Sequence, residues 1–147
     1  DRAAEIWSAP SLADELLLAY QPKRQQPEGY SIDDHPNLYG GIVKQLFDQL
    51  REQILALDEC VVEVFWKLYV AYKAETNFVD IVPQAKGLRL SLNMEFHQVD
   101  DPRGICKDVS NIGRWGNGDV EVRLEALEDV SYVMGLISQS LETQLGD

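Results

Sequence analysis

Residues 109–124 constrain the fold more than any other stretch of this 147-residue chain. The first part of the stretch crowds three glycines around one tryptophan, Trp115. Glycine adopts positive φ angles without steric cost, so we expect the backbone to turn tightly more than once here. The second part, residues 119–124, alternates valine and leucine with Glu121 and Arg123. This alternation predicts a strand with one buried face.

Two roles fit Trp115. In the first, its indole fills a gap between a sheet and the last helix. In the second, the loop 111–119 and nearby lysine-bearing strands form a ligand-facing surface, on which the indole is a stacking plane for a base. Glycines favour the second role because they let a ligand approach backbone N–H groups closely. Donors suited to a phosphate or a base edge lie beside the indole: Asn111, Arg114 and Asn117.

Two stretches have the periodicity of helices that pack on a core. In residues 38–57 and again in residues 126–145, large apolar side chains recur every three or four positions, with polar residues between them. We expect both helices to pack on the same face of a sheet.

Five stretches predict strands: residues 60–66, 68–73, 76–82, 88–93 and 119–124. Whether 60–66 is a separate strand or continues the preceding helix stays open. The short connections favour antiparallel neighbours, because a parallel crossover needs about a dozen residues or more. The sequence therefore predicts an α+β fold, an antiparallel sheet of four to five strands packed against two main helices. We also expect a turn at residues 100–104 and a short helix at 103–109.

The N-terminal part has a different composition. Residues 2–20 predict a helix, and residues 21–36, with three prolines and few aliphatic side chains, predict a linker. The chain begins with Asp1 rather than methionine, so we expect a fragment of a longer protein. Residues 1–37 would be the tail of a preceding domain, and residues 38–147 a single α+β domain.

Charge and composition exclude several classes of protein. The formal net charge of −12 argues against a surface that binds nucleic acid all over. Residues 67–123 carry as many basic as acidic side chains, so this region can still meet an anionic partner locally. No apolar run approaches the roughly 20 residues of a membrane span. The two widely spaced cysteines predict reduced thiols and a cytoplasmic location.

Lysines and aromatic residues interleave at 66–73. On a regular strand, Lys67, Tyr69 and Lys73 share one face, and Trp66 lies on the other. With Lys86 on a later turn, the first set predicts a surface for an anionic ligand. The alternative is that these side chains form the solvated side of a sheet.

Catalytic and metal-binding motifs are weak. His35 and His97 are the two histidines, and His35 lies in the expected linker, where a solvated loop is the simplest reading. A restriction-type nuclease would pair Asp80 with an acidic-x-lysine motif, but Gln84 stands where the carboxylate is needed before Lys86. We expect no metal, no cofactor and no catalytic residue in this domain.

The chain resembles a known family at residues 67–73, 77–84, 86–88, 100–104, 108–110 and 113–119, the last including Trp-Gly-Asn-Gly-Asp. The similarity covers about residues 42–142. The family is a prokaryotic domain of unknown function, DUF5655, whose members are often labelled "predicted transport protein". Arg114 replaces a more usual histidine of that family, which argues against proton chemistry at this position. The label carries little weight because the sequence has nothing that crosses a bilayer.

The resemblance implies a context. Such domains commonly lie C-terminal to a ParB-like domain and a His-Asn-His-type nuclease domain, as in modification-dependent restriction systems. Residues 1–20 look like the tail of that nuclease domain, and the layout is similar, by analogy of fold only, to small MmcQ/YjbR-like domains.

We therefore expect a non-catalytic recognition or assembly module of a DNA-directed defence protein. Its partners would be nucleic acid and the upstream nuclease domain. A degenerate nuclease domain and a pure subunit-assembly domain are the alternatives.

Overall fold

The computed structural model describes residues 24–25, 29–111 and 118–145, and all structural statements concern these residues. Within them, seven strands form one sheet in the order β2-β3-β4-β5-β6-β8-β7. The central strands are β4 (Val70–Lys73), β5 (Asn77–Pro83), β6 (Leu88–Leu92) and β8 (Val120–Leu124). The outer strands are β2 (Arg24–Gln25) and β3 (Val62–Phe65) on one side and β7 (Lys107–Asp108) on the other. All neighbours are antiparallel except β2, which runs parallel to β3.

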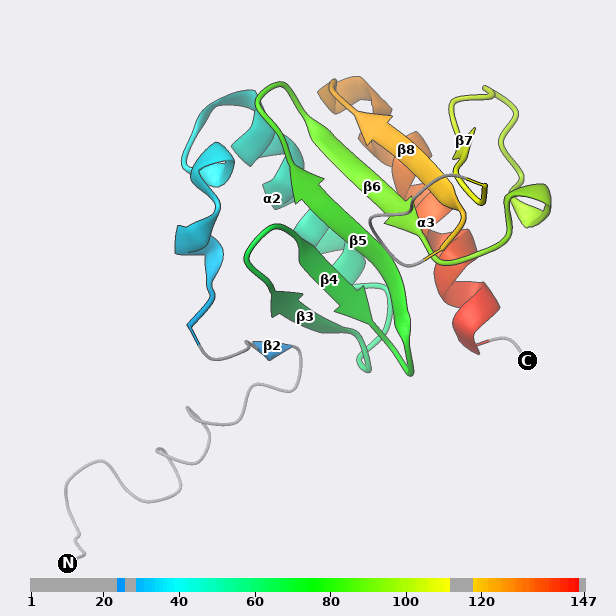
Figure 1. The fold of residues 1–147 in the computed structure, drawn as a ribbon, viewed down its shortest axis with the longest axis horizontal. Coiled ribbons are helices and arrows are strands. Elements are labelled where there is room, and N and C mark those ends of the chain that lie inside the picture. Colours follow the sequence, from blue (N-terminus) through cyan, green and yellow to red (C-terminus); the bar gives the residue numbers. More distant parts are fainter. Residues whose placement is uncertain (1–23, 26–28, 112–117, 146–147) are drawn as a thin grey trace, which may run out of the picture.

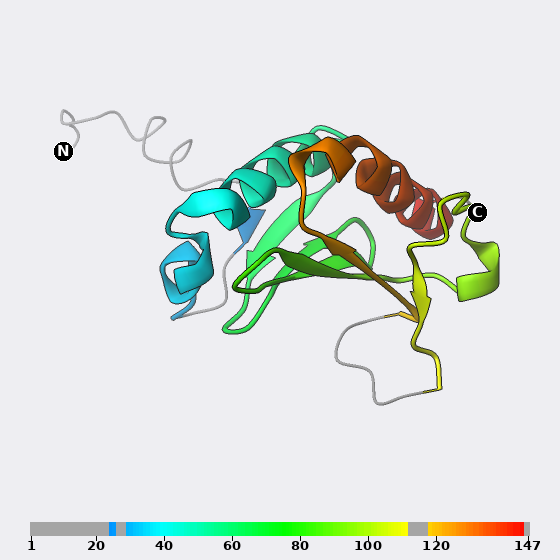
Figure 2. The same ribbon diagram turned by 90° about the horizontal axis from the view of Figure 1, so that it is seen from above.

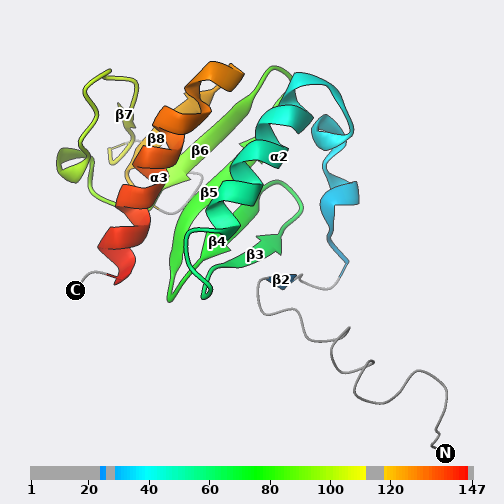
Figure 3. The same cartoon turned by 180° about the vertical axis from the view of Figure 1, so that it is seen from behind.

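Two helices, α2 (Gly41–Leu55) and α3 (Val130–Leu145), cover one face of this sheet. Figure 2 shows both helices on the same side, and Figure 3 shows them in front of the strands. Among the described residues no helix lies on the opposite face, which is turned toward the viewer in Figure 1. We call it the helix-free face. The α+β class, the antiparallel pairing and the shared helix face are confirmed, although the sheet has more than the four to five strands expected.

Alternation in the strands separates the two faces of the sheet. The core contains side chains from both helices and from every second position of the central strands. The fully buried leucines of β6 are Leu88, Leu90 and Leu92. Residues between them, Arg89 and Ser91, therefore belong to the helix-free face.

One expectation for the irregular segments was wrong. Residues 103–109 do not form a helix: a turn closes with a hydrogen bond from Gly104 N to Asp101 O, and β7 follows. At the end of the expected linker, 3₁₀ turns occupy Ile32–Asp34 and Pro36–Leu38. Ser31 begins the first turn with a capping box, and Leu38 lies in the core. The expected helix at 2–20 lies outside the described residues, and the division into a preceding domain stays a prediction.

Among the described helices, none combines the length and the apolar character needed to cross a membrane.

Candidate functional site

An acidic row crosses the helix-free face. Ala71 of β4 pairs with Asp80, Asp80 with Ser91 of β6, and Ser91 with Glu121 of β8. Asp80 is only 1% exposed and accepts a hydrogen bond from Asn77 Nδ2 at 3.2 Å. Asp80 and Ser91 each take part in further polar or electrostatic interactions. This row therefore places acceptor groups on three adjacent strands, of which the Asp80 carboxylate is closed to solvent.

A basic row lies one step along the strands from the acidic row. Val82 of β5 pairs with Arg89, and Arg89 pairs with Arg123 of β8. The Arg123 side chain is 57% exposed, with Nε at 4.0 Å from Glu121 Oε2 and Nη1 at 3.4 Å from Gln84 Oε1. The 3.4 Å hydrogen bond is long, and more than half of the side chain is exposed, so Arg123 is accessible to a ligand.

The β3–β4 hairpin places two aromatic rings beside these rows. The Trp66 and Tyr69 rings stack with centroids 6.4 Å apart and an interplanar angle of 25°. The hairpin closes with a hydrogen bond from Trp66 N to Tyr69 O at 2.8 Å, so Lys67 and Leu68 form a two-residue loop. On one regular strand across residues 66–73, the pattern expected from the sequence, Trp66 and Tyr69 would lie on opposite faces. The hairpin loop interrupts that strand, so Trp66 and Tyr69 lie on the same face and their rings stack.

Electrostatics connect this hairpin to the acidic row. Burial raises the pKa of the Tyr69 phenol, and the nearby Asp80 carboxylate raises it further. Tyr69 therefore stays neutral far above physiological pH and keeps its hydroxyl as a donor and acceptor. The Trp66 side is more open, since this residue is 39% exposed. A stacked pair with one ring accessible is a platform suited to a flat apolar group.

His35 contacts the β3–β4 hairpin through one hydrogen bond and one ring contact. Its Nε2 lies 2.7 Å from the Trp66 carbonyl oxygen, so Nε2–H donates to that oxygen. The imidazole also packs near the Phe65 ring, with centroids 6.1 Å apart, and the residue is 4% exposed. The expectation of a solvated histidine was wrong, because a long-range hydrogen bond draws the segment before α2 onto the sheet.

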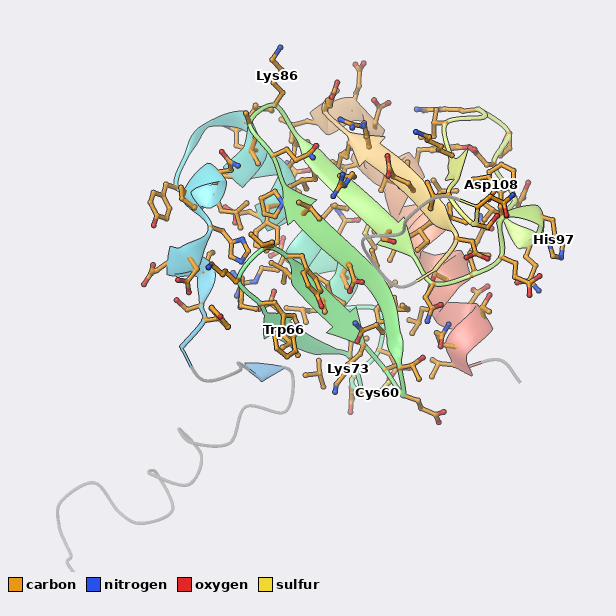
Figure 4. All side chains as sticks on the ribbon, viewed as in Figure 1. Cys60, Trp66, Lys73, Lys86, His97 and Asp108 are labelled. Carbon is orange, nitrogen blue, oxygen red and sulfur yellow. The ribbon has the colours of Figure 1, made fainter. Side chains whose placement is uncertain are left out.

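The eight ligand-binding candidates from the sequence do not form one cluster. Tyr69 lies on the helix-free face, and Lys67 lies in the hairpin loop. Lys73 ends β4 where the pairing with β5 shifts register, and Lys86 projects from the opposite end of the sheet (Figure 4). Asn111 is exposed beyond β7. The other three candidates, Arg114, Trp115 and Asn117, lie outside the described residues.

Two buried carboxylates, those of Glu63 and Asp80, lie on opposite faces of the sheet. Glu63 pairs with Tyr72 in the sheet register, on the helix side. Its carboxylate is fully buried and bound by Arg51 Nε at 2.7 Å and Tyr72 Oη at 2.8 Å. Asp80 is on the helix-free face. These two carboxylates therefore cannot hold one metal ion together, and Glu63 has a structural role.

A polar cluster joins the loop after β6 to α3. Asp101 accepts hydrogen bonds from Tyr132 Oη and, at 2.8 Å, from Cys106 N. Desolvation alone would raise the pKa of Asp101, but the bonds from Tyr132 and Cys106 lower it below its ordinary value. Burial, followed by the Asp101 carboxylate, raises the pKa of the Cys106 thiol to about 12. This thiol is therefore a poor nucleophile at neutral pH, and both Cys60 and Cys106 are free.

Comparison with known proteins identifies the family. Residues 40–144 match the family described as "Domain of unknown function (DUF5655)". The chain belongs to this family. An uncharacterized protein of Haemophilus influenzae (strain ATCC 51907 / DSM 11121 / KW20 / Rd) is 35% identical to the DUF5655 chain over 113 residues. The aligned part covers 77% of this chain and 37% of the relative, so the chain spans little more than a third of that protein's length. No solved structure matches this DUF5655 chain.

Sequence reasoning missed two parts of the site in this DUF5655 domain. The first is the arginine pair: alternation alone places Arg89 and Arg123 on a polar face, but only the β6–β8 register sets them side by side. The second is the Trp66–Tyr69 stack, which depends on the hairpin turn. A two-residue loop between apolar strands is the signal that would have revealed it.

Proposed function

We propose that this DUF5655 domain is a non-catalytic recognition module that binds single-stranded nucleic acid on its helix-free face. The observation that carries the proposal is the Trp66–Tyr69 stack, which shares this face with a row of arginines. Single-strand binders combine aromatic stacking planes with positive charge that follows the backbone of the strand. The sheet separates the carboxylates of Glu63 and Asp80, so they cannot hold a catalytic metal ion together, which supports recognition without catalysis.

The distribution of charge supports a local contact. The chain as a whole carries a formal charge of −12, so acidic helix surfaces repel a polyanion. Repulsion elsewhere favours binding through the face where basic side chains gather. Glu121, whose side chain is 23% exposed, adds an acceptor for an exocyclic amino group of a base. The face therefore combines a stacking plane, donors for phosphate and an acceptor for a base edge.

The proposed setting is a longer DNA-directed defence protein in the cytoplasm, in which an upstream nuclease domain supplies the chemistry. Its support is the restriction-type context that the family resemblance implies. The loop candidates Arg114, Trp115 and Asn117 stay predictions within this proposal.

A second candidate is subunit assembly through the hairpin loop. The observation that favours it is Leu68, which is 60% exposed beside the exposed Trp66. A protein partner would bury both side chains, whereas a nucleic acid strand needs the indole and the arginines.

Trp66→Ala will weaken binding of a labelled oligothymidylate strand by roughly tenfold, because base–aromatic stacking is worth about 1–3 kcal/mol. Fluorescence anisotropy measures the affinity, and thermal unfolding will show a much smaller change than for a core tryptophan. Leu68→Ala is the matched control, since it removes an exposed apolar side chain from the same loop. Equal affinity of the wild type and Trp66→Ala would remove the proposed function. A loss of self-association in Leu68→Ala would favour assembly.

A further inference from the structure

The basic row and the aromatic stack lie level with each other across the sheet. Val70 pairs with Ile81, so the preceding residue, Tyr69, lies level with Val82. Val82 pairs with Arg89, and Arg89 with Arg123. Neighbouring strands are about 4.8 Å apart, so Arg89 is about 10 Å from the Tyr69 strand and Arg123 about 5 Å further. One row of the helix-free face therefore carries a ring at one end and two guanidinium groups at the other.

Two arginines directly opposite each other are unfavourable in a sheet. Like charges at paired positions of antiparallel strands repel, which destabilises the pair unless an anion lies between them. The contacts of Arg123 with Glu121 and Gln84 are long, at 4.0 and 3.4 Å. Arg89 takes part in at least one polar or electrostatic interaction of its own. Both side chains are at least partly accessible to solvent.

We propose that Arg89 and Arg123 form a clamp for a phosphodiester group of a nucleic acid single strand, a more distant base of which stacks on Trp66. This inference rests on the proposed function and names the group that the face holds. Guanidinium groups suit it because their planar donors bind phosphate oxygens in a bidentate manner. Binding the anion would also relieve the repulsion between the two arginines. A nucleic acid single strand that lies along this row would cross β4, β5, β6 and β8 in turn.

The test compares Arg89→Gln, Arg123→Gln and the double variant with Lys44→Gln. Lys44 is an exposed lysine that pairs with Asp48 on α2, so its substitution removes the same charge from the helix side. Anisotropy titrations with labelled oligothymidylate are repeated from about 50 to 300 mM NaCl. Each arginine substitution will reduce the slope of log affinity against log salt by about 0.7, and the double variant by about 1.4. Lys44→Gln will leave the slope unchanged. With neutral methylphosphonate linkages, the wild type and the double variant will bind alike.

The outcomes separate this clamp from the proposed function. An unchanged salt slope in the double variant, with binding still weakened by Trp66→Ala, would overturn the clamp and leave the proposed function standing. If the wild type does not bind the oligothymidylate, a titration with inorganic phosphate tests the clamp by itself. Shifts of the Arg89 and Arg123 Nε–H signals in NMR spectra would then support the clamp without nucleic acid, and the absence of such shifts would overturn it.

Discussion

Gly118→Ala will lower the free energy of unfolding by about 2–5 kcal/mol. Gly118 has φ = +114°, a conformation that residues with a side chain rarely adopt. A Cβ at this position would lie 2.1 Å from the Leu92 carbonyl oxygen and 2.5 Å from Asn93 Cα. Both contacts involve backbone atoms, so the start of β8 would have to move away from β6. Backbone strain and overpacking each cost about 1–3 kcal/mol.

Gly104→Ala is the matched control for Gly118→Ala. Gly104 also has a positive φ, +69°, but an added Cβ meets nothing within 4 Å. This variant will lose only the conformational part, about 1–2 kcal/mol. Urea unfolding of the three proteins measures the difference. Equal losses in both variants would show that close packing against β6 does not explain the glycine at 118.

Arg51→Ala will destabilise the domain by about 3–5 kcal/mol, because it leaves the Glu63 carboxylate buried without its cation. Arg51 Nε lies 2.7 Å from Glu63 Oε2 and Nη2 lies 2.9 Å from Oε1, so the pair is bidentate. The guanidinium also lies 5.9 Å from the centroid of the Phe47 ring and 5.7 Å from that of Phe65. Truncation therefore removes packing as well as charge.

Lys44→Ala provides the comparison for this ion pair. Lys44 and Asp48 are both nearly half exposed, at 47% and 46%, so losing their pair will cost less than about 1 kcal/mol. Replacing Arg51 and Glu63 together with methionine will recover much of the loss, because no buried charge then remains. Denaturant unfolding measures all three proteins. An Arg51→Ala variant as stable as Lys44→Ala would contradict the structural role of the buried pair.

Local patterns were sufficient for the elements of this fold. The Leu88–Leu92 strand alternates strictly, and the α2 stripe recurs every three or four residues, so both elements follow from the side chains alone. Short connections then force antiparallel neighbours. Residues 103–109 were predicted wrongly because Asp101 binds Cys106 N and Tyr132, and these contacts hold the segment in an extended path.

The candidate site depends on contacts that no local pattern encodes. Arg89 and Arg123 are far apart in the sequence and meet through the register of β6 and β8. His35 was assigned to a solvated linker because prolines surround it, yet its hydrogen bond to the Trp66 carbonyl spans 31 positions. Such long-range pairs are set by the folded sheet, so the sequence shows the side chains available but not which of them meet.

We propose the helix-free face as the ligand-binding surface of the domain. The most direct measurement is a titration of the ¹⁵N-labelled domain with an oligothymidylate strand, followed by NMR. Backbone amide shifts will concentrate at residues 66–69 of the hairpin and along β6 and β8 around Arg89 and Arg123. Shifts confined to α2 and α3, or no shifts at a concentration of the strand that saturates known single-strand binders, would contradict this proposal.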